Sequence, residues 1–136
     1  MTSRGAIGLA FAFFFALAGL ARAEAPVRAV GAIGFTVSNL DAAVHFYTEV
    51  LDFEPHGGIV EIAGPGAERL QGVFGLRMRV ARLALGEETL ELTEYLAPQG
   101  HAFPADTSGN DRWFQHVAIV VRDMDRAYAR LREHRV

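Results

Sequence analysis

The sequence predicts an α+β domain built from a repeated unit of one strand, one helix and three more strands. Three observations support this prediction. Several segments alternate apolar and polar residues, as half-buried strands do. Two segments show helical spacing after a capping signal. The residues that open the first unit also recur 84 positions later, so we expect a second unit that is shortened to its first strand and helix.

The repeat aligns the segment from Ile33 with the segment from Val117. At this offset of 84 residues apolar positions fall on apolar positions, and Asp41 falls on Asp125. An internal duplication is the economical explanation. The domain at 24–136 then consists of a first unit, a linker and a partial second unit, at about 28–97, 98–112 and 113–136.

The first residues are typical of a signal peptide. The stretch from Gly5 to Leu20 is almost uninterrupted apolar sequence, Arg4 precedes it, and Ala21 and Ala23 form an A-x-A cleavage site. A membrane anchor is the alternative, but the stretch is short and ends in a processing signal. We therefore expect cleavage after residue 23 and no stable membrane anchor afterwards. The product would be exported, to the periplasm in a Gram-negative bacterium and otherwise to the medium.

Composition and charge exclude several classes of protein. The chain of 136 residues has no cysteine, which excludes disulfides, thiolate catalysis and cysteine-ligated zinc. Its 13 basic residues are all arginine and stand against 16 acidic residues, for a formal net charge of -3. The sequence lacks the basic cluster that would indicate a nucleic-acid partner. No phosphate loop, nucleotide fingerprint or Ser/His/Asp arrangement is visible.

The first strand and helix of the first unit follow from spacing and capping signals. Residues 30–37 alternate as a strand does. Ser38 is then expected to cap a helix, with Asp41 three residues later as the acid of a capping box. The helix should run to about Leu51, because apolar residues recur at intervals of three and four up to that point.

The rest of the first unit is expected to contain a strand, a short helix and a hairpin. Gly64-Pro65-Gly66 should end the strand, and Gly86-Glu87 should form the tight turn of the hairpin. The expected ranges are 53–62 for the strand, 67–74 for the helix, and 77–85 and 88–95 for the hairpin. In the partial second unit, a strand is expected at 114–121 and a helix from Asp123 to the end.

Polar residues of the second hairpin strand share one face of the predicted sheet. Thr89, Glu91, Thr93 and Tyr95 alternate with leucines, so the two sets point to opposite faces. An unpaired carboxylate on the apolar face would carry a large desolvation cost. We therefore expect the polar set to line a cavity and the leucines to pack under the helices. By the same alternation, His116 belongs to the cavity side of its own strand.

Three motifs carry a resemblance to a known superfamily. They are GFTVSNLDAAVHFYTEVLDF at 34–53, LELTEY at 90–95 and HVAIVV at 116–121. With the repeated unit, they resemble the vicinal oxygen chelate superfamily of glyoxalases, extradiol dioxygenases and bleomycin- or fosfomycin-resistance proteins. The resemblance covers essentially all of the sequence after the leader. It implies a glyoxalase-like fold of paired βαβββ modules with a cavity between them for a small oxygenated molecule.

The resemblance also implies a divalent metal. Metal-using members have four ligands, of which this sequence keeps Glu91 and His116, while Ala32 stands where a histidine is expected. By the repeat offset, the fourth metal ligand would fall at roughly position 175, past Val136. A carboxylate and an imidazole suit Zn, Ni, Fe, Co or Mn. Because a second unit without its last three strands would leave the strand at 114–121 with an open edge, we interpret the chain as a fragment of a two-unit protein. Completion of the sheet by a second copy in a homodimer is the alternative.

Two functions are compatible with these residues. The first is an exported, metal-dependent lyase, isomerase or dioxygenase-like enzyme in which the metal polarises vicinal oxygens of a small substrate; no catalytic base is assigned. The alternative is a metal-free protein of the bleomycin-resistance type that binds or sequesters a small molecule. In that case Glu91 and His116 would pair with each other or with Arg77 or Arg79. The expected substrate-binding residues are Thr36, Thr89, Thr93 and Tyr95.

Overall fold

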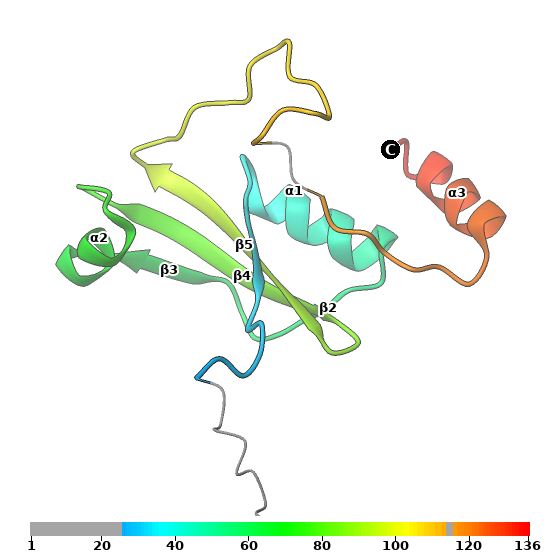
Figure 1. Cartoon of the computed structure of the whole chain (residues 1–136), viewed down its shortest axis with the longest axis horizontal. Coiled ribbons are helices and arrows are strands. Elements are labelled where there is room, and N and C mark those ends of the chain that lie inside the picture. The colour runs from blue at the N-terminus through cyan, green and yellow to red at the C-terminus, as the bar shows by residue number, and fades with distance from the viewer. Residues whose placement is uncertain (1–25, 114–115) are drawn as a thin grey trace, which may run out of the picture.

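The structure is a computed structural model that describes residues 26–113 and 116–136 (Figure 1). The leader expected at 1–23 therefore lies outside the described residues. In the described ranges, no helix has the length and apolar character needed to cross a bilayer. In chain order the elements are β1 (Ile33–Thr36), α1 (Leu40–His45), the π-helical turn η1 (Phe46–Val50), β2 (Glu54–Pro55), β3 (Val60–Ala63), α2 (Pro65–Gln71), β4 (Arg77–Leu85), β5 (Glu88–Ala97) and α3 (Met124–Glu133).

These elements form a mixed sheet with helices, which confirms the predicted α+β class. The strand order is β1, β5, β4, β2, and β3 also pairs with β4. β1 runs parallel to β5, and the other pairings are antiparallel. The predicted hairpin is present as β4 and β5, and Gly86 in its turn takes the left-handed φ of 62° that glycine tolerates without steric cost. The hairpin register places Leu85 opposite Glu88.

The helical segment after β1 begins one residue later than predicted. Asn39, not Ser38, is the N-cap, because its backbone is extended and its side-chain Oδ1 accepts a hydrogen bond from the amide of Ala42 at 2.9 Å. Asp41 does not close a capping box but binds Arg79 on β4. α1 continues directly into η1. The chain then leaves the helix through Asp52, whose φ is +60°.

The single strand predicted at 53–62 is wrong, because two strands with an interruption occupy this segment. Gly57, with a φ of +85°, turns the chain out of the pleated conformation between β2 and β3. The amide of His56 still donates to the carbonyl of Arg82, at 2.8 Å. α2 lies earlier than the helix predicted at 67–74, since Pro65 occupies its first turn, where the fixed φ of proline is favourable.

The strand predicted at 114–121 is also wrong over the residues that the structure describes there, 116–121, which have no regular secondary structure. The alternation of side chains is nevertheless correct: Val117 and Ile119 pack against the main core, whereas His116 is exposed. A strand also needs a neighbour for its backbone N–H and C=O groups. In the described ranges, β1 to β5 pair only with one another. The helix predicted from Asp123 to the end is present as α3 with Asp123 as its N-cap, but it ends at Glu133.

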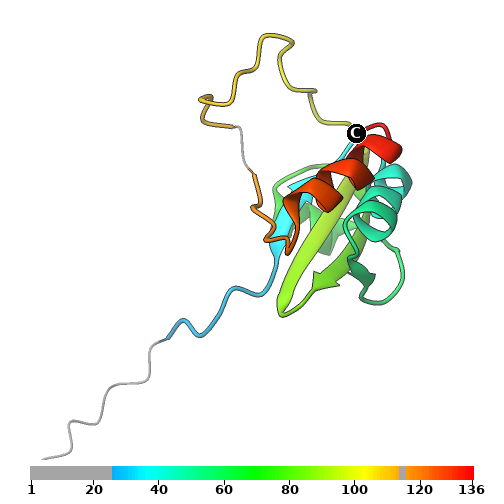
Figure 2. The ribbon, with the colours of Figure 1, turned by 90° about the vertical axis from the view of Figure 1, so that its right-hand side faces the viewer.

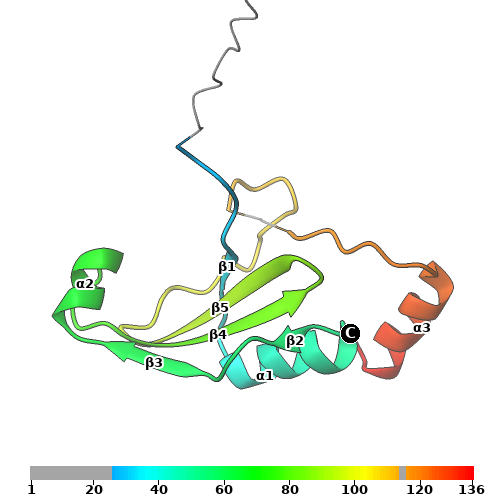
Figure 3. The same cartoon turned by 90° about the horizontal axis from the view of Figure 1, so that it is seen from below.

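The two faces of the sheet differ. α1 lies along one face of the sheet, which we call the helix face (Figures 2 and 3). On this face the main core of buried side chains packs. These core residues are Leu40, Phe53, Ala81, Leu83, Leu90 and Leu92. A smaller cluster of Leu76, Met78 and Val80 packs with residues of β3 and α2 at one end of the sheet. We call the opposite side of β4 and β5, which carries Arg82, Thr89, Glu91 and Thr93, the open face.

Candidate functional site

The open face carries the polar series that the sequence predicts as a cavity lining. Along β5, Thr89, Glu91 and Thr93 are half-buried and alternate with Leu90 and Leu92, which are at most 1% exposed. β1 extends the series, because Thr36 lies opposite Thr93 in the parallel register. The alternation therefore separates polar from apolar side chains as predicted.

Glu91 is bound by an arginine that the sequence analysis did not pair with it. The Nε group of Arg82 donates a hydrogen bond to Glu91 Oε2 at 2.8 Å, and Nη2 forms an ion pair with the same oxygen at 2.7 Å. The two residues face each other across the hairpin, and their side chains are 59% and 33% exposed. The suggested pairing of Glu91 with Arg77 or Arg79 is wrong, since those arginines bind other acids.

Arg79 has a different role, although it lies only three residues before Arg82. Its guanidinium binds both oxygens of Asp41 on α1, at 2.8 and 2.9 Å, and Glu94 on β5 at 3.2 Å. These hydrogen bonds lower the pKa of Asp41 and raise that of Arg79, each because the charged form gains a partner. The cluster attaches the start of α1 to the helix face and is structural.

Tyr95 and His116 lie in different surroundings from Glu91, whereas Thr36 lies opposite Thr93 on the neighbouring strand. Thr36 is exposed on β1. The hydroxyl of Tyr95 donates to Gln71 Oε1 at 3.4 Å, and its side chain packs in the smaller cluster beside α2. His116 is exposed on the irregular segment, and across residues 26–113 and 116–136 no hydrogen bond or ion pair joins it to Glu91. The structure thus brings Glu91 together with Arg82 rather than with His116.

The sequence and fold match a family of known proteins. Residues 29–136 match the Glyoxalase/Bleomycin resistance protein/Dioxygenase superfamily. The chain belongs to this superfamily. The predicted membership in the vicinal oxygen chelate (glyoxalase) superfamily is therefore confirmed.

Two known proteins are similar to this chain. A 2-epi-5-epi-valiolone epimerase from an Actinomyces species is 40% identical over 108 residues, which cover 76% of this chain. The match spans only 57% of the length of that epimerase. A solved glyoxalase family protein from Bacillus cereus has the same fold, with a TM-score of 0.74 and 24% identity over 85% of this chain and 77% of that one.

The side-chain donors of the described residues can be tested for their fit to the divalent metal that the resemblance implies. In the two described ranges, no three His, Cys, Asp or Glu side chains lie together in a group that could hold a metal ion. Ala32 offers no side-chain donor, and the charge of Glu91 is already neutralised by Arg82. These residues by themselves therefore do not fit a metal centre, and Glu91 and His116 stay a prediction as ligands.

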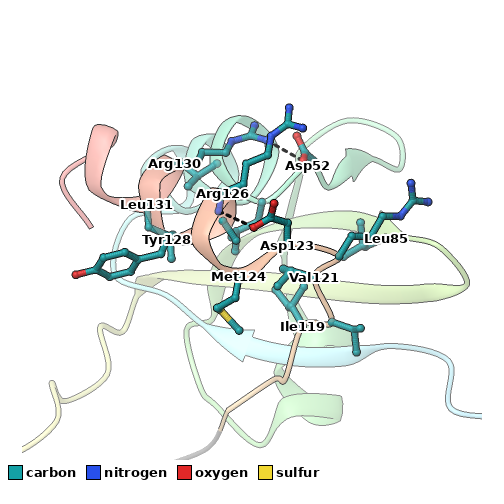
Figure 4. A pocket seen from close by; sticks show the side chains of 15 residues that line it. Asp52, Leu85, Ile119, Val121, Asp123, Met124, Arg126, Tyr128, Arg130 and Leu131 are labelled. Carbon is teal, nitrogen blue, oxygen red and sulfur yellow. Dashed lines mark hydrogen bonds and ion pairs between the residues drawn. The ribbon is translucent and has the colours of Figure 1, made fainter.

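A hollow of about 560 Å³ lies on the other side of the molecule, between the end of η1 and α3 (Figure 4). Its walls are largely apolar and include Leu85, Ile119 and Leu131. Arg130 links the two sides, because its guanidinium donates to Asp52 at 2.8 Å and to the carbonyl of Glu49 at 2.6 Å. Sequence reasoning missed this hollow because it depends on where α3 docks, which no local pattern specifies.

Proposed function

We propose that this member of the glyoxalase superfamily is an isomerase-type enzyme that epimerises a small, hydroxyl-bearing ketone at the open face. The observation that carries the proposal is the 40% identity over 108 residues to a 2-epi-5-epi-valiolone epimerase. Because the match spans 57% of that epimerase, the activity of the whole enzyme is part of the proposal.

The chemistry of epimerisation suits the residues of the open face. The ending of the relative's substrate name denotes a ketone. A stereocentre beside a carbonyl inverts when a base takes its proton and an acid then returns a proton to the opposite side. The intermediate carries negative charge on the carbonyl oxygen, which a fixed cation or hydrogen-bond donor stabilises. Arg82 supplies a cation, and Thr36, Thr89 and Thr93 supply hydroxyls that can donate to or accept from substrate hydroxyls.

Proton exchange in heavy water tests this function. The full-length protein is incubated with 2-epi-5-epi-valiolone in D₂O, and proton NMR follows the C–H signals beside the carbonyl. We expect loss of one such signal and the appearance of an epimer. Thr93→Val should slow exchange by up to about tenfold through the loss of one hydrogen bond. Thr107→Val is the matched control, because its hydroxyl binds the carbonyl of Pro104 in the linker.

Two other outcomes have definite meanings. Saturable binding of the ketone without exchange would contradict the isomerase and favour the alternative, a binding or sequestration protein. If the protein shows neither binding nor exchange of this ketone, the ketone is not its substrate. Exchange that Thr93→Val and Thr107→Val reduce equally would exclude the open face as the place of reaction.

A further inference from the structure

The geometry points to an oxyanion-binding role for Arg82. We infer that its guanidinium, positioned by Glu91, binds the negatively charged oxygen of a planar, oxygen-rich ligand such as the enolate or enediolate form of a small ketone. This inference rests on the proposed function and adds to it the residue that recognises the charge. It also assigns a different use to the carboxylate that the superfamily resemblance suggests as a metal ligand.

Arg82 keeps hydrogen-bond donors that no other residue in the described ranges uses. An arginine side chain presents five N–H donors in a rigid fork. Arg82 directs Nε and Nη2 at a single oxygen, Glu91 Oε2. Nη1 has no partner among the described residues, and the side chain is 59% exposed. The guanidinium is therefore fixed at one edge and available to a ligand at the other.

Arg79, three residues earlier on the same strand, does not offer a free terminal nitrogen. Both of its terminal nitrogens are engaged, since three carboxylate oxygens of Asp41 and Glu94 bind them. Its side chain is 27% exposed and lies on the helix face under α1. A ligand would have to displace two acids to reach Arg79, whereas at Arg82 it needs to displace none.

The surroundings of Arg82 offer hydroxyls within reach of the same ligand. Glu91 lies opposite it across the hairpin, and Thr89 and Thr93 flank Glu91 on the same face of β5. Same-face neighbours on a strand are about 7 Å apart. A ligand of a few carbon atoms can thus contact the guanidinium with a charged oxygen and a threonine with a hydroxyl. Arginine suits this role because its planar fork matches two adjacent oxygens.

Arg82 also competes with any cation for Glu91. A cation that binds Glu91 Oε2 must first displace a charge-assisted hydrogen bond and an ion-pair contact from Arg82. Ala32, at the position of a further expected ligand, offers nothing to offset that loss. The guanidinium already provides the positive charge at this carboxylate. The donor set of the described residues therefore favours an arginine as the group that stabilises the oxyanion.

Oxalate is the probe for this inference, because it is planar and carries two adjacent charged oxygens, as an enediolate does. Its binding to the full-length protein is measured by calorimetry after treatment with EDTA and removal of the chelator. We expect saturable binding that Arg82→Ala weakens by about tenfold or more, as loss of charged hydrogen bonds should. Arg82→Lys should retain part of the affinity, because a point charge remains without the fork.

Arg77→Ala is the matched control. Arg77 lies on the same strand, is 58% exposed and is paired with Glu61 at 3.5 Å, so it matches Arg82 in charge, exposure and pairing. Its removal should leave oxalate binding unchanged. Amide NMR spectra of each variant establish that the fold is retained, so that a loss of binding in Arg82→Ala reports on the guanidinium.

Three results would overturn the inference. One is the absence of oxalate binding to the wild-type protein, and the second is equal weakening by Arg82→Ala and Arg77→Ala. The third is binding that requires added Zn²⁺ or Mn²⁺ and is lost in Glu91→Ala, which would make a metal the oxyanion-binding group. Since oxalate undergoes no turnover, these results are independent of the exchange experiment on the ketone, and either proposal can fail alone.

Discussion

The helix face and the open face of the same two strands serve different purposes. On the helix face Leu90 and Leu92 are at most 1% exposed, and both terminal nitrogens of Arg79 are bound by acids. On the open face Arg82 keeps free donors beside half-buried threonines. Because successive side chains alternate between faces, one hairpin supplies both the core and the candidate site. The separation implies that substitutions on the open face should leave the stability of the core largely unchanged. Substitutions on the helix face that retain the fold should leave ligand binding at the open face unchanged.

The largest expected difference in the free energy of unfolding is between substitutions of two adjacent residues on opposite faces. Leu92→Ala removes a side chain that is 0% exposed in the core and should lower the free energy of unfolding by about 2–5 kcal/mol. Thr93→Ala, one residue later on the open face, should lower it by about 1 kcal/mol or less. Urea denaturation of the two variants measures the difference. Similar losses in both would contradict the division of the faces.

A smaller effect is expected at the start of the helix that covers the core. Asn39→Ala removes the N-cap hydrogen bond to the amide of Ala42 and should cost about 1 kcal/mol of unfolding free energy. Ser38→Ala is the control, because Ser38 is exposed and does not cap the helix; its effect should stay within about 0.5 kcal/mol. The reverse order, measured by the same denaturation, would restore Ser38 as the cap.

The smallest expected change in stability is at Asp41, the acid through which α1 binds the helix face. The hydrogen bonds from Arg79 lower the pKa of Asp41 below its ordinary value of 3.8. A lowered pKa means that the pair stabilises the fold above pH 3.8 and that this contribution is lost as the pH falls through the folded-state value. Asp41→Asn should therefore be less stable than wild type near pH 6, with the difference shrinking in acid.

Thermal denaturation between pH 6 and pH 2 follows this difference, and the arginine provides the control. In an Arg79→Ala background, Asp41→Asn should have no pH-dependent effect, because the interaction that shifts the pKa is already gone. If the pH-dependent effect of Asp41→Asn persists unchanged in that background, the shift belongs to an interaction with another group.

Much of the division between the helix face and the open face could be predicted from the alternation in the sequence. The register of the hairpin could also have been predicted. The tight turn places Leu85 opposite Glu88, and each residue back along β4 then faces one residue further along β5. Counting in this way pairs Arg82 with Glu91. The turn therefore contained the signal for the central contact of the candidate site, which residue types alone did not reveal.

The wrong strand predictions have a common physical cause. Local alternation specifies which side chains are buried, but a strand exists only where its backbone groups find a neighbour. Val117 and Ile119 pack against the core as their pattern requires, yet residues 116–121 pair with no strand of the described sheet. At 53–62, the left-handed backbone at Gly57 interrupts an otherwise suitable pattern. Pairing depends on distant parts of the chain, so it is not visible in a short window.

Asp52 has a consequence for the response of the molecule to ionic strength. Its φ of +60° is one that glycine adopts more readily, but a glycine would offer no carboxylate to Arg130 on α3. This exposed link joins residues 78 positions apart, and none of the residues of α3 is buried. Dissolved salt screens exposed charge pairs far more than it weakens a leucine core. Concentrated electrolyte should thus release the last helix well before the sheet melts.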